Sequence, residues 1–182
     1  MYKRQKLPWK ILKHKIKIGY NPYCFTNLSL TRYFKNHFKL VPIYDDLISK
    51  NKSRRNNNKF YFIKDHVSGE SSKSKINRVL KYLRKDKSDS LFITAPENVA
   101  WLLNLRGKDN PYSPIPNSRL ILKNNGDMFL FANKSKTQGL SIKKTLFKIK
   151  VIDENKIDIF LKNFVSKKII LDRLSCSLAY KN

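Results

Sequence analysis

The alternation of apolar and polar positions is most regular in the middle of the chain. Four apolar side chains there recur at the i, i+3, i+4, i+7 spacing of one helix face: Ile76, Val79, Leu80 and Leu83. Because the hydroxyl of Ser71 or Ser72 can accept from the free N–H groups of a first turn, a helix is predicted from there to about two residues beyond this stripe. A continuous apolar run at 91–94 predicts a buried strand. Pro96 suits the first turn of a second helix, which Gly107 can end in a left-handed cap.

The next segment predicts a β-hairpin. Apolar runs at 118–123 and 128–133 flank the sequence Asn-Asn-Gly-Asp, and Asn-Gly tolerates the positive φ of tight turns. The remaining apolar segments predict a strand edge, a short helix and a closing strand: residues 150–152, 157–164 and 168–172. Strands that alternate with helices, together with one hairpin, predict an α/β fold with a mixed β-sheet and flanking helices.

The first part of the chain predicts a smaller strand–helix–strand unit. Ile16, Ile18 and Tyr20 alternate with lysine and glycine, which is typical of a half-buried strand. A short helix and a second strand follow: residues 29–36 and 40–44. The stretch after them is polar, charged and free of apolar residues, as in a linker or surface loop. We therefore expect three parts: residues 1–50, a linker at 51–60, and residues 61–182.

The large positive charge of the chain suggests a negatively charged partner. The 182 residues carry a formal net charge of +26, with 30 Lys and 9 Arg against 13 acidic residues. Such an excess suits nucleic acid or an anionic membrane. The bias runs through the whole chain, together with 18 Asn and 17 Ile, and Lys outnumbers the bidentate Arg, so compositional drift is favoured over specific nucleic-acid binding. The basic aromatic stretch at 31–39 could stack bases, but packing of a helix with a charged, solvated face is the favoured interpretation.

Composition also bears on the compartment. No run approaches the roughly 20 apolar residues that cross a bilayer, so no membrane partner is expected. The basic N-terminal stretch has neither a continuous apolar core nor a small-residue cleavage site, so no signal peptide is predicted. Cys24 and Cys176 are far apart and in no CxxC pair, which favours two reduced thiols over a disulfide. A cytoplasmic protein is therefore predicted.

Residues that could carry catalysis are sparse. The three histidines lie in no HExxH or other ligand-spaced cluster: His14, His37 and His66. Asp45 and Asp46 have no His or Glu at metal spacing nearby, and Cys24 has no evident His partner. The sequence has no GxSxG, and its five Gly residues are scattered singly rather than gathered in a phosphate-binding loop. Neither a metal site nor a catalytic residue is predicted within this chain.

Two segments resemble a known family. Residues 69–76 read GESSKSKI, and residues 98–116 read NVAWLLNLRGKDNPYSPIP. They are similar to the G-x-S-S-x-x-K-I and W-L-x-N-x-R-G-x-D segments in the middle domain of the Xaa-Pro aminopeptidases (aminopeptidase P, in the creatinase family). Residues 18–26 also resemble a pattern near the end of that family's first domain, I-G-x-D-P-x-x-x-T, with Asn21 where the family has Asp. An Arg-Pro motif that the family carries next is not matched at 53–55.

The resemblance implies a creatinase N-terminal-like (ribonuclease H-like) fold, with the end of the first domain at 1–50 and the second at 61–182. It also implies a parent reaction, removal of an N-terminal residue that precedes proline, with two divalent metal ions, typically manganese, held in a third domain. Because the chain stops at Asn182, we expect a truncated or split-gene product that is inactive alone and is partnered by a separately encoded catalytic domain. The alternatives are a small basic nucleic-acid-binding protein and a folded relic without function.

By the same resemblance, Trp101, Arg106 and Asp109 form the candidate rim of a substrate cleft. The Arg106 guanidinium could hold a peptide carboxylate or carbonyl. An internal Arg106–Asp109 pair that shapes the loop is the favoured alternative, and Trp101 is expected more as a core anchor than as a ligand platform. Asn104 is expected to serve the turn rather than a substrate.

Overall fold

The computed structural model describes four stretches of the chain: residues 16–34, 38–45, 57–140 and 148–181. The chain divides into two compact units, one of Met1–Asn51 with Ser177–Asn182 and one of Lys52–Cys176. Most of the expected linker at 51–60 lies outside the described residues, and the expected domain boundaries stay predictions. Within the described residues, no helix combines the length and apolarity that a bilayer crossing requires.

The first unit consists of a strand–helix–strand element together with the last described residues of the chain. Its elements are β1 (Lys17–Tyr20), α1 (Asn27–Tyr33), β2 (Lys39–Pro42) and the 3₁₀ turn η4 (Leu178–Tyr180). β1 and β2 pair in parallel, with Lys17 opposite Lys39. The helix begins two residues before the predicted start because Thr26 caps it, exchanging hydrogen bonds with Ser29 in a capping box. The predicted end of this helix, at 35–36, lies outside the described residues.

The second unit is built on a five-stranded mixed sheet with strand order β8-β7-β6-β4-β9. Its strands are β3 (Tyr61–Phe62), β4 (Ser90–Ile93), β5 (Leu105–Arg106), β6 (Arg119–Lys123), β7 (Met128–Phe131), β8 (Ile149–Ile152) and β9 (Ile169–Leu171). Its helices are α2 (Asp65–Ser68), α3 (Ser72–Lys85), α4 (Pro96–Leu103), α5 (Lys134–Thr137), the 3₁₀ turn η3 (Glu154–Lys156) and α6 (Ile157–Lys162). The β4–β6 and β6–β7 pairs are antiparallel, whereas β7–β8 and β4–β9 are parallel. The predicted α/β class with a mixed sheet is confirmed.

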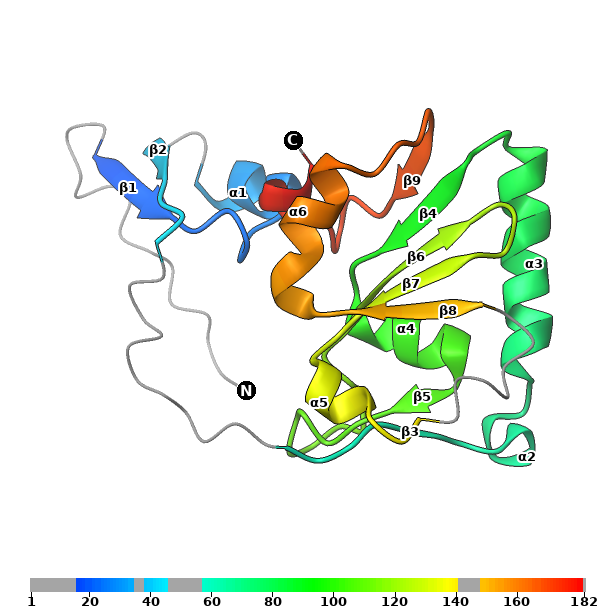
Figure 1. Ribbon diagram of the computed structural model, residues 1–182. Coiled ribbons are helices and arrows are strands. Elements are labelled where there is room, and N and C mark those ends of the chain that lie inside the picture. The colour runs from blue at the N-terminus through cyan, green and yellow to red at the C-terminus, as the bar shows by residue number, and fades with distance from the viewer. Residues whose placement is uncertain (1–15, 35–37, 46–56, 141–147, 182) are drawn as a thin grey trace. The chain divides into compact units, whose positions relative to one another are not determined.

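Helices α3 and α4 cover one face of this sheet and α6 covers the other (Figure 1). The side chains beneath α3 and α4 form the main core, which includes Leu83, Val99, Leu102, Leu120, Leu122, Met128 and Leu130. On the opposite face, Phe160 of α6 packs on Phe129 and Phe131, with ring centroids 4.9 and 5.1 Å apart. The two faces share β7 because a strand sends successive side chains to opposite sides.

Several predicted elements are confirmed where local signals were strong. Ser71, rather than Ser72, caps α3 by accepting from the Ser74 N–H, and the apolar stripe of α3 faces the core. The Asn-Gly turn closes the β6–β7 hairpin, with Gly126 at φ +95°. β8 lies at the edge of the sheet, as predicted.

The predicted cap at Gly107 is wrong, since α4 ends earlier. Asn104 takes the left-handed conformation, with φ 53° and ψ 29°. Gly107 serves instead for close approach: a Cβ there would lie 2.9 Å from the Pro116 Cα and 3.0 Å from the ring of Phe60. The short pair β3–β5 escaped prediction because two-residue strands have no periodicity of their own.

The core can be tested with two neighbouring residues of α3. Leu83 is fully buried and Tyr82 is 61% exposed. Replacing Leu83 by Ala leaves a cavity under the helix, so we expect the free energy of unfolding to fall by about 3 kcal/mol in urea titrations. The control Tyr82→Ala should change it by less than about 0.5 kcal/mol. Equal effects of the two variants would contradict this description of the core.

Candidate functional site

The two motif segments meet at a buried lysine. Lys75, on α3, is 2% exposed. Its ammonium donates hydrogen bonds to the Trp101 carbonyl oxygen at 2.8 Å and to the Asn104 Oδ1 at 2.7 Å. The same ammonium lies 4.8 Å from the centroid of the Trp101 ring, within the range of a cation–π contact. One side chain thus joins residues 69–76 to the last turn of α4.

Asn104 continues this network into α2 and the turn between α2 and α3. Its amide nitrogen donates to the Ser68 Oγ and the Glu70 carbonyl, both at 3.0 Å, and to the Asp65 Oδ1 at 3.3 Å. Its left-handed backbone lets the side chain reach back across the end of the helix, since Asn adopts this conformation more readily than most residues. The expectation that Asn104 serves the turn is confirmed, and it also binds three segments together.

Neighbouring charges shift the pKa of Lys75 in opposite directions. Burial lowers the pKa of Lys75 below its ordinary value of 10.5, the Glu70 carboxylate opposes this shift, and the Arg106 cation adds to it. Glu70 is itself held by the Ser74 hydroxyl at 2.6 Å and by Arg78 at 2.8 Å, which lower the pKa of its carboxyl. Because this carboxylate stays ionised, the cations of α3 have a fixed counter-charge at the start of the helix.

The candidate rim residues lie around this network. Trp101 is 48% exposed, so the expectation of a core anchor is wrong. Its ring instead lies beside two cations of α3, with the Arg78 guanidinium carbon 5.8 Å from the ring centroid. The indole is therefore half-exposed, with two cations beside its ring.

Arg106 and Asp109 do not form the internal pair that the sequence favoured. The Arg106 Nη1 donates to the carbonyl oxygens of Ala100 and Leu105, each at 2.9 Å. Asp109 pairs with Lys136 of α5 and accepts from the Asn117 N–H at 2.6 Å. The loop is thus held by a lysine 27 positions farther along the chain, a contact with no local signal. Whether these residues line a substrate cleft stays a prediction.

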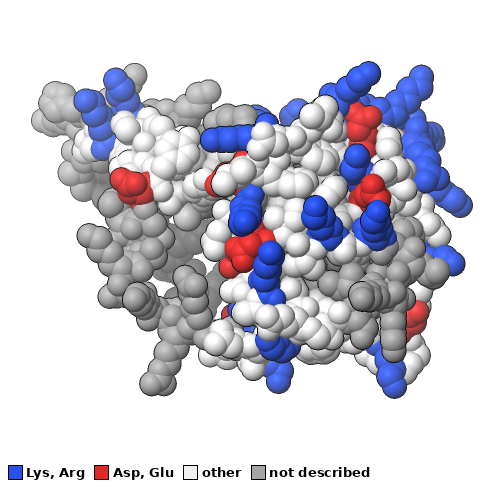
Figure 2. All heavy atoms as spheres, in the orientation of Figure 1, with Lys and Arg blue, Asp and Glu red and all other residues white. Residues whose placement is uncertain are grey.

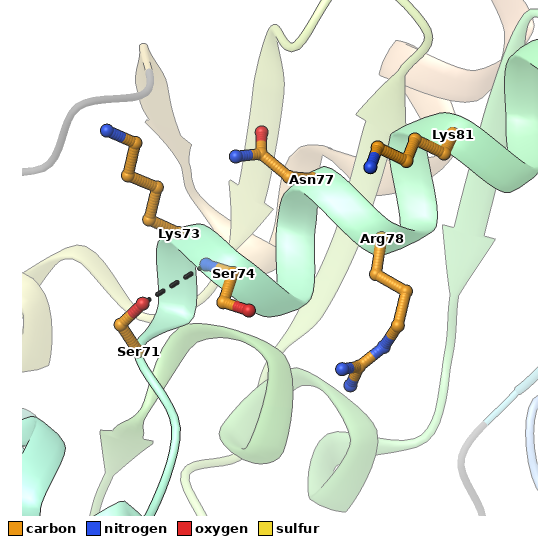
Figure 3. Close-up of a pocket in the computed structure, with 6 residues that line it drawn as sticks. All are labelled: Ser71, Lys73, Ser74, Asn77, Arg78 and Lys81. Atoms are coloured by element: carbon orange, nitrogen blue, oxygen red, sulfur yellow. Dashed lines mark hydrogen bonds between the residues drawn. The ribbon is translucent and has the colours of Figure 1, made fainter.

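The outer side of α3 is strongly basic. Its 14 residues include six Lys and Arg and no acidic residue. A shallow hollow of about 540 Å³ lies on this side. Figure 3 labels the residues that line it: Ser71, Lys73, Ser74, Asn77, Arg78 and Lys81. In Figure 2, Lys and Arg side chains gather along the edge where α3 runs. Because Arg78 is engaged by Glu70, Lys73 and Lys81 are the freely solvated cations of this hollow.

The described residues do not fit the metal ions that the resemblance implies. No three His, Cys, Asp or Glu side chains gather anywhere in the described part of the chain. Asp65 and Glu70 are engaged by Asn104, Ser74 and Arg78 rather than aimed at a shared point. Cys24 is exposed and Cys176 is buried, and the expectation that both are reduced thiols stays a prediction. No catalytic step can be assigned to a metal within this part of the molecule.

The central place of Lys75 in this network was not predicted from the sequence. One signal could have found it, because Lys75 stands four residues before Val79 and eight before Leu83 and so falls on the apolar face of α3. A lysine at such a position must find acceptors or lose its charge.

Comparison with known proteins shows the family. Residues 51–182 match the model of the Creatinase/Prolidase N-terminal domain. The chain belongs to this family. The predicted resemblance and the creatinase N-terminal type of fold are thereby confirmed.

Individual relatives agree with this assignment. The Xaa-Pro aminopeptidase 1 of Dictyostelium discoideum is 30% identical over 79 residues, which cover 43% of this chain and 12% of the relative. A probable Xaa-Pro aminopeptidase P of Pyricularia oryzae is 30% identical over 125 residues, 66% of this chain and 19% of the relative. The chain therefore spans less than a fifth of the length of these curated relatives.

A solved structure has the same fold. The X-prolyl aminopeptidase of Caenorhabditis elegans, described as a cytosolic enzyme with a di-nuclear active site, superimposes with a TM-score of 0.72. The match covers 87% of this chain and 29% of that enzyme, at 20% sequence identity. At this identity the likeness concerns the fold alone.

The Lys75 network can be tested by removing its charge. Lys75→Met keeps most of the side-chain volume but leaves the Asn104 Oδ1 buried without its donor. We expect the free energy of unfolding to fall by about 2 kcal/mol. The control Lys73→Met, on the exposed side of the same helix, should lower it by less than about 0.5 kcal/mol.

The pH dependence of stability separates this network from simple packing. Because the pKa of Lys75 is lower in the folded chain, the unfolded chain binds the proton more tightly. The contribution of Lys75 to stability therefore rises with pH between its lowered folded value and 10.5. This rise should disappear in Lys75→Met, and its persistence there would assign it to other groups.

Two substitutions separate the roles of Asn104, which are its left-handed backbone conformation and its side-chain hydrogen bonds. Asn104→Gly keeps the left-handed backbone but loses every side-chain hydrogen bond, whereas Asn104→Ala loses the bonds and is also strained. We expect both variants to unfold earlier in urea, with Ala less stable than Gly by about 1 kcal/mol. Equal stabilities of the two would mean that the backbone relaxes when the amide is removed.

Proposed function

We propose that the second unit serves as the non-catalytic, N-terminal-type domain of an Xaa-Pro aminopeptidase-like metallopeptidase. The parent reaction would be removal of an N-terminal residue that precedes proline. The observation that carries this proposal is the Lys75–Asn104 bond, because it ties the two family motifs into one rigid element and sets where the chain leaves α4. A domain of this kind acts by positioning a surface, not by supplying reacting groups.

Arg106 is the residue best placed to meet a substrate or a neighbouring domain. It is half-buried, and among the described residues only its Nη1 atom has hydrogen-bond partners. Its Nε and Nη2 donors therefore remain available for a carboxylate or a carbonyl oxygen, which a guanidinium can bind in a fork. The two carbonyl bonds fix the orientation of that fork.

Trp101 and Asp109 fit the same role. The half-exposed indole is oriented by Lys75 and Arg78, so it can offer a preformed apolar surface. Asp109 holds the loop by pairing with Lys136 and so keeps the segment after Arg106 in place. These three residues form the proposed rim.

The metal chemistry is assigned to a separate catalytic domain, on the same polypeptide or on another. This division is supported by the absence of a ligand cluster in the described residues and by the name of the C. elegans enzyme, whose di-nuclear site belongs to a much longer chain. A cytoplasmic location is proposed on the same comparison. The nucleic-acid-binding alternative has no support among the matched family and relatives.

The proposal predicts that activity requires a catalytic domain. We expect no cleavage of an Xaa-Pro dipeptide by the full 182-residue chain with Mn²⁺. Adding the separately expressed catalytic region encoded by the same genome should produce a stable complex in sedimentation. The kcat/KM of the mixture should be at least about tenfold higher than that of the catalytic region alone. Turnover by the chain alone would refute the non-catalytic role, and failure to form a complex would refute the domain role.

The rim is tested in the mixture of this chain with the catalytic region, by replacing Arg with Lys at two positions. Arg106→Lys keeps the charge but loses the fork, so kcat/KM should fall about tenfold while the complex still forms. Arg84→Lys, on the outer side of α3, is the matched control and should leave kcat/KM unchanged. Equal effects would remove Arg106 from the rim.

A further inference from the structure

A small cavity lies in the second unit and shares Trp101 with the proposed rim. Its volume is about 230 Å³. It is lined by four polar residues, Thr94, Asn98, Asp172 and Ser175, and six apolar ones, Val79, Leu91, Phe92, Ile93, Trp101 and Leu102. A mostly apolar hollow with a few polar groups on one side is the usual form of a small-ligand site.

The place of this cavity follows from the topology. β4 and β9 run side by side in parallel, so their carboxyl ends meet at one edge (Figure 1). Thr94 directly follows β4, and Asp172 directly follows β9. In open α/β sheets, the crevice beyond the carboxyl ends of parallel strands is the common ligand position. Because β9 has three residues and lies at the sheet edge, it leaves part of β4 uncovered there.

The polar side of the cavity is organised by hydrogen bonds. The hydroxyls of Thr94 and Ser175 lie 2.9 Å apart and bridge the two strand ends. The Asp172 Oδ1 accepts from the Leu174 N–H at 2.9 Å, which orients the carboxylate. Among the described residues, its Oδ2 has no hydrogen-bond partner, so one anionic oxygen remains for a ligand.

The opposite wall carries the aromatic ring of Trp101. The Trp101 ring lies beside the Lys75 ammonium and the Arg78 guanidinium, and the Lys75 ammonium is itself bound to Asn104. These contacts fix the indole before any ligand arrives. Asp172 is the one charged residue among the ten that line the cavity, although the chain as a whole is strongly basic.

We propose that this cavity binds a small organic ammonium ion with a compact apolar group. The carboxylate of Asp172 would take the ammonium, the two hydroxyls would accept its remaining N–H groups, and Trp101, Val79 and Leu102 would enclose the apolar part. A cavity of about 230 Å³ has room for an ammonium ion that carries a branched alkyl group. The inference does not rest on the proposed peptidase role.

The test uses three probes with branched alkyl groups of similar size and different heads: isopentylammonium, isopentanol and isovalerate. Trp9→Phe leaves Trp101 as the single indole, whose fluorescence reports binding. We expect isopentylammonium to saturate with a millimolar Kd, about three- to fivefold tighter than isopentanol, because a solvent-accessible ion pair adds only that much. Isovalerate should not bind. Amide resonances of Thr94 and Ser175 should shift on titration and so locate the site.

Two isosteric variants decide whether Asp172 is responsible. Asp172→Asn should remove the preference for ammonium over alcohol. Glu97→Gln, which removes the same charge from the exposed first turn of α4, should keep it. The proposal fails if the ammonium and the alcohol bind equally to the unmodified cavity, if both variants behave alike, or if no probe saturates below about 50 mM.

Discussion

The buried ammonium of Lys75 is the constraint on which the described site depends. No carboxylate within the described residues lies at ion-pair distance from it, so its charge is satisfied by a carbonyl, an amide oxygen and an aromatic ring. A buried cation without acceptors is costly, and this cost couples α3, α4 and the loop before α3. Asn104, in its left-handed conformation, places its Oδ1 where it accepts from the Lys75 ammonium. The same conformation sets the direction in which the chain leaves α4 toward Arg106.

The scarcity of acidic residues gives each acidic contact unusual weight. In a chain with 39 basic and 13 acidic residues, the described ion pairs join Glu70 to Arg78, Asp109 to Lys136 and Asp86 to Lys168. The acidic partners lie outside the helices and strands: Glu70 just before α3, Asp86 just after it, and Asp109 in the loop after β5. Within the described residues, these three carboxylates therefore hold connections between elements.

Prediction from the sequence was best where a structural signal repeats over neighbouring residues. The stripe from Ile76 to Leu83 placed α3, and Asn-Gly placed the β6–β7 hairpin, because spacing and turn chemistry are local. It failed for the β3–β5 pair, whose two-residue strands exist only because distant backbones meet. It also failed for Asp109, since proximity in sequence suggested Arg106 whereas folding brought Lys136.

Membership of the Creatinase/Prolidase N-terminal family and the order of the main helices and strands were determined by the sequence itself, through motif residues and periodicity. Only the tertiary structure decided that Lys75 is buried against Asn104, that Trp101 stays half-exposed, and that Asp172 faces the end of β4. The reason is geometric. Hydrophobic spacing records which side of an element is buried, but the partner of a buried charge depends on how separate elements cross, and no run of neighbouring residues encodes that crossing.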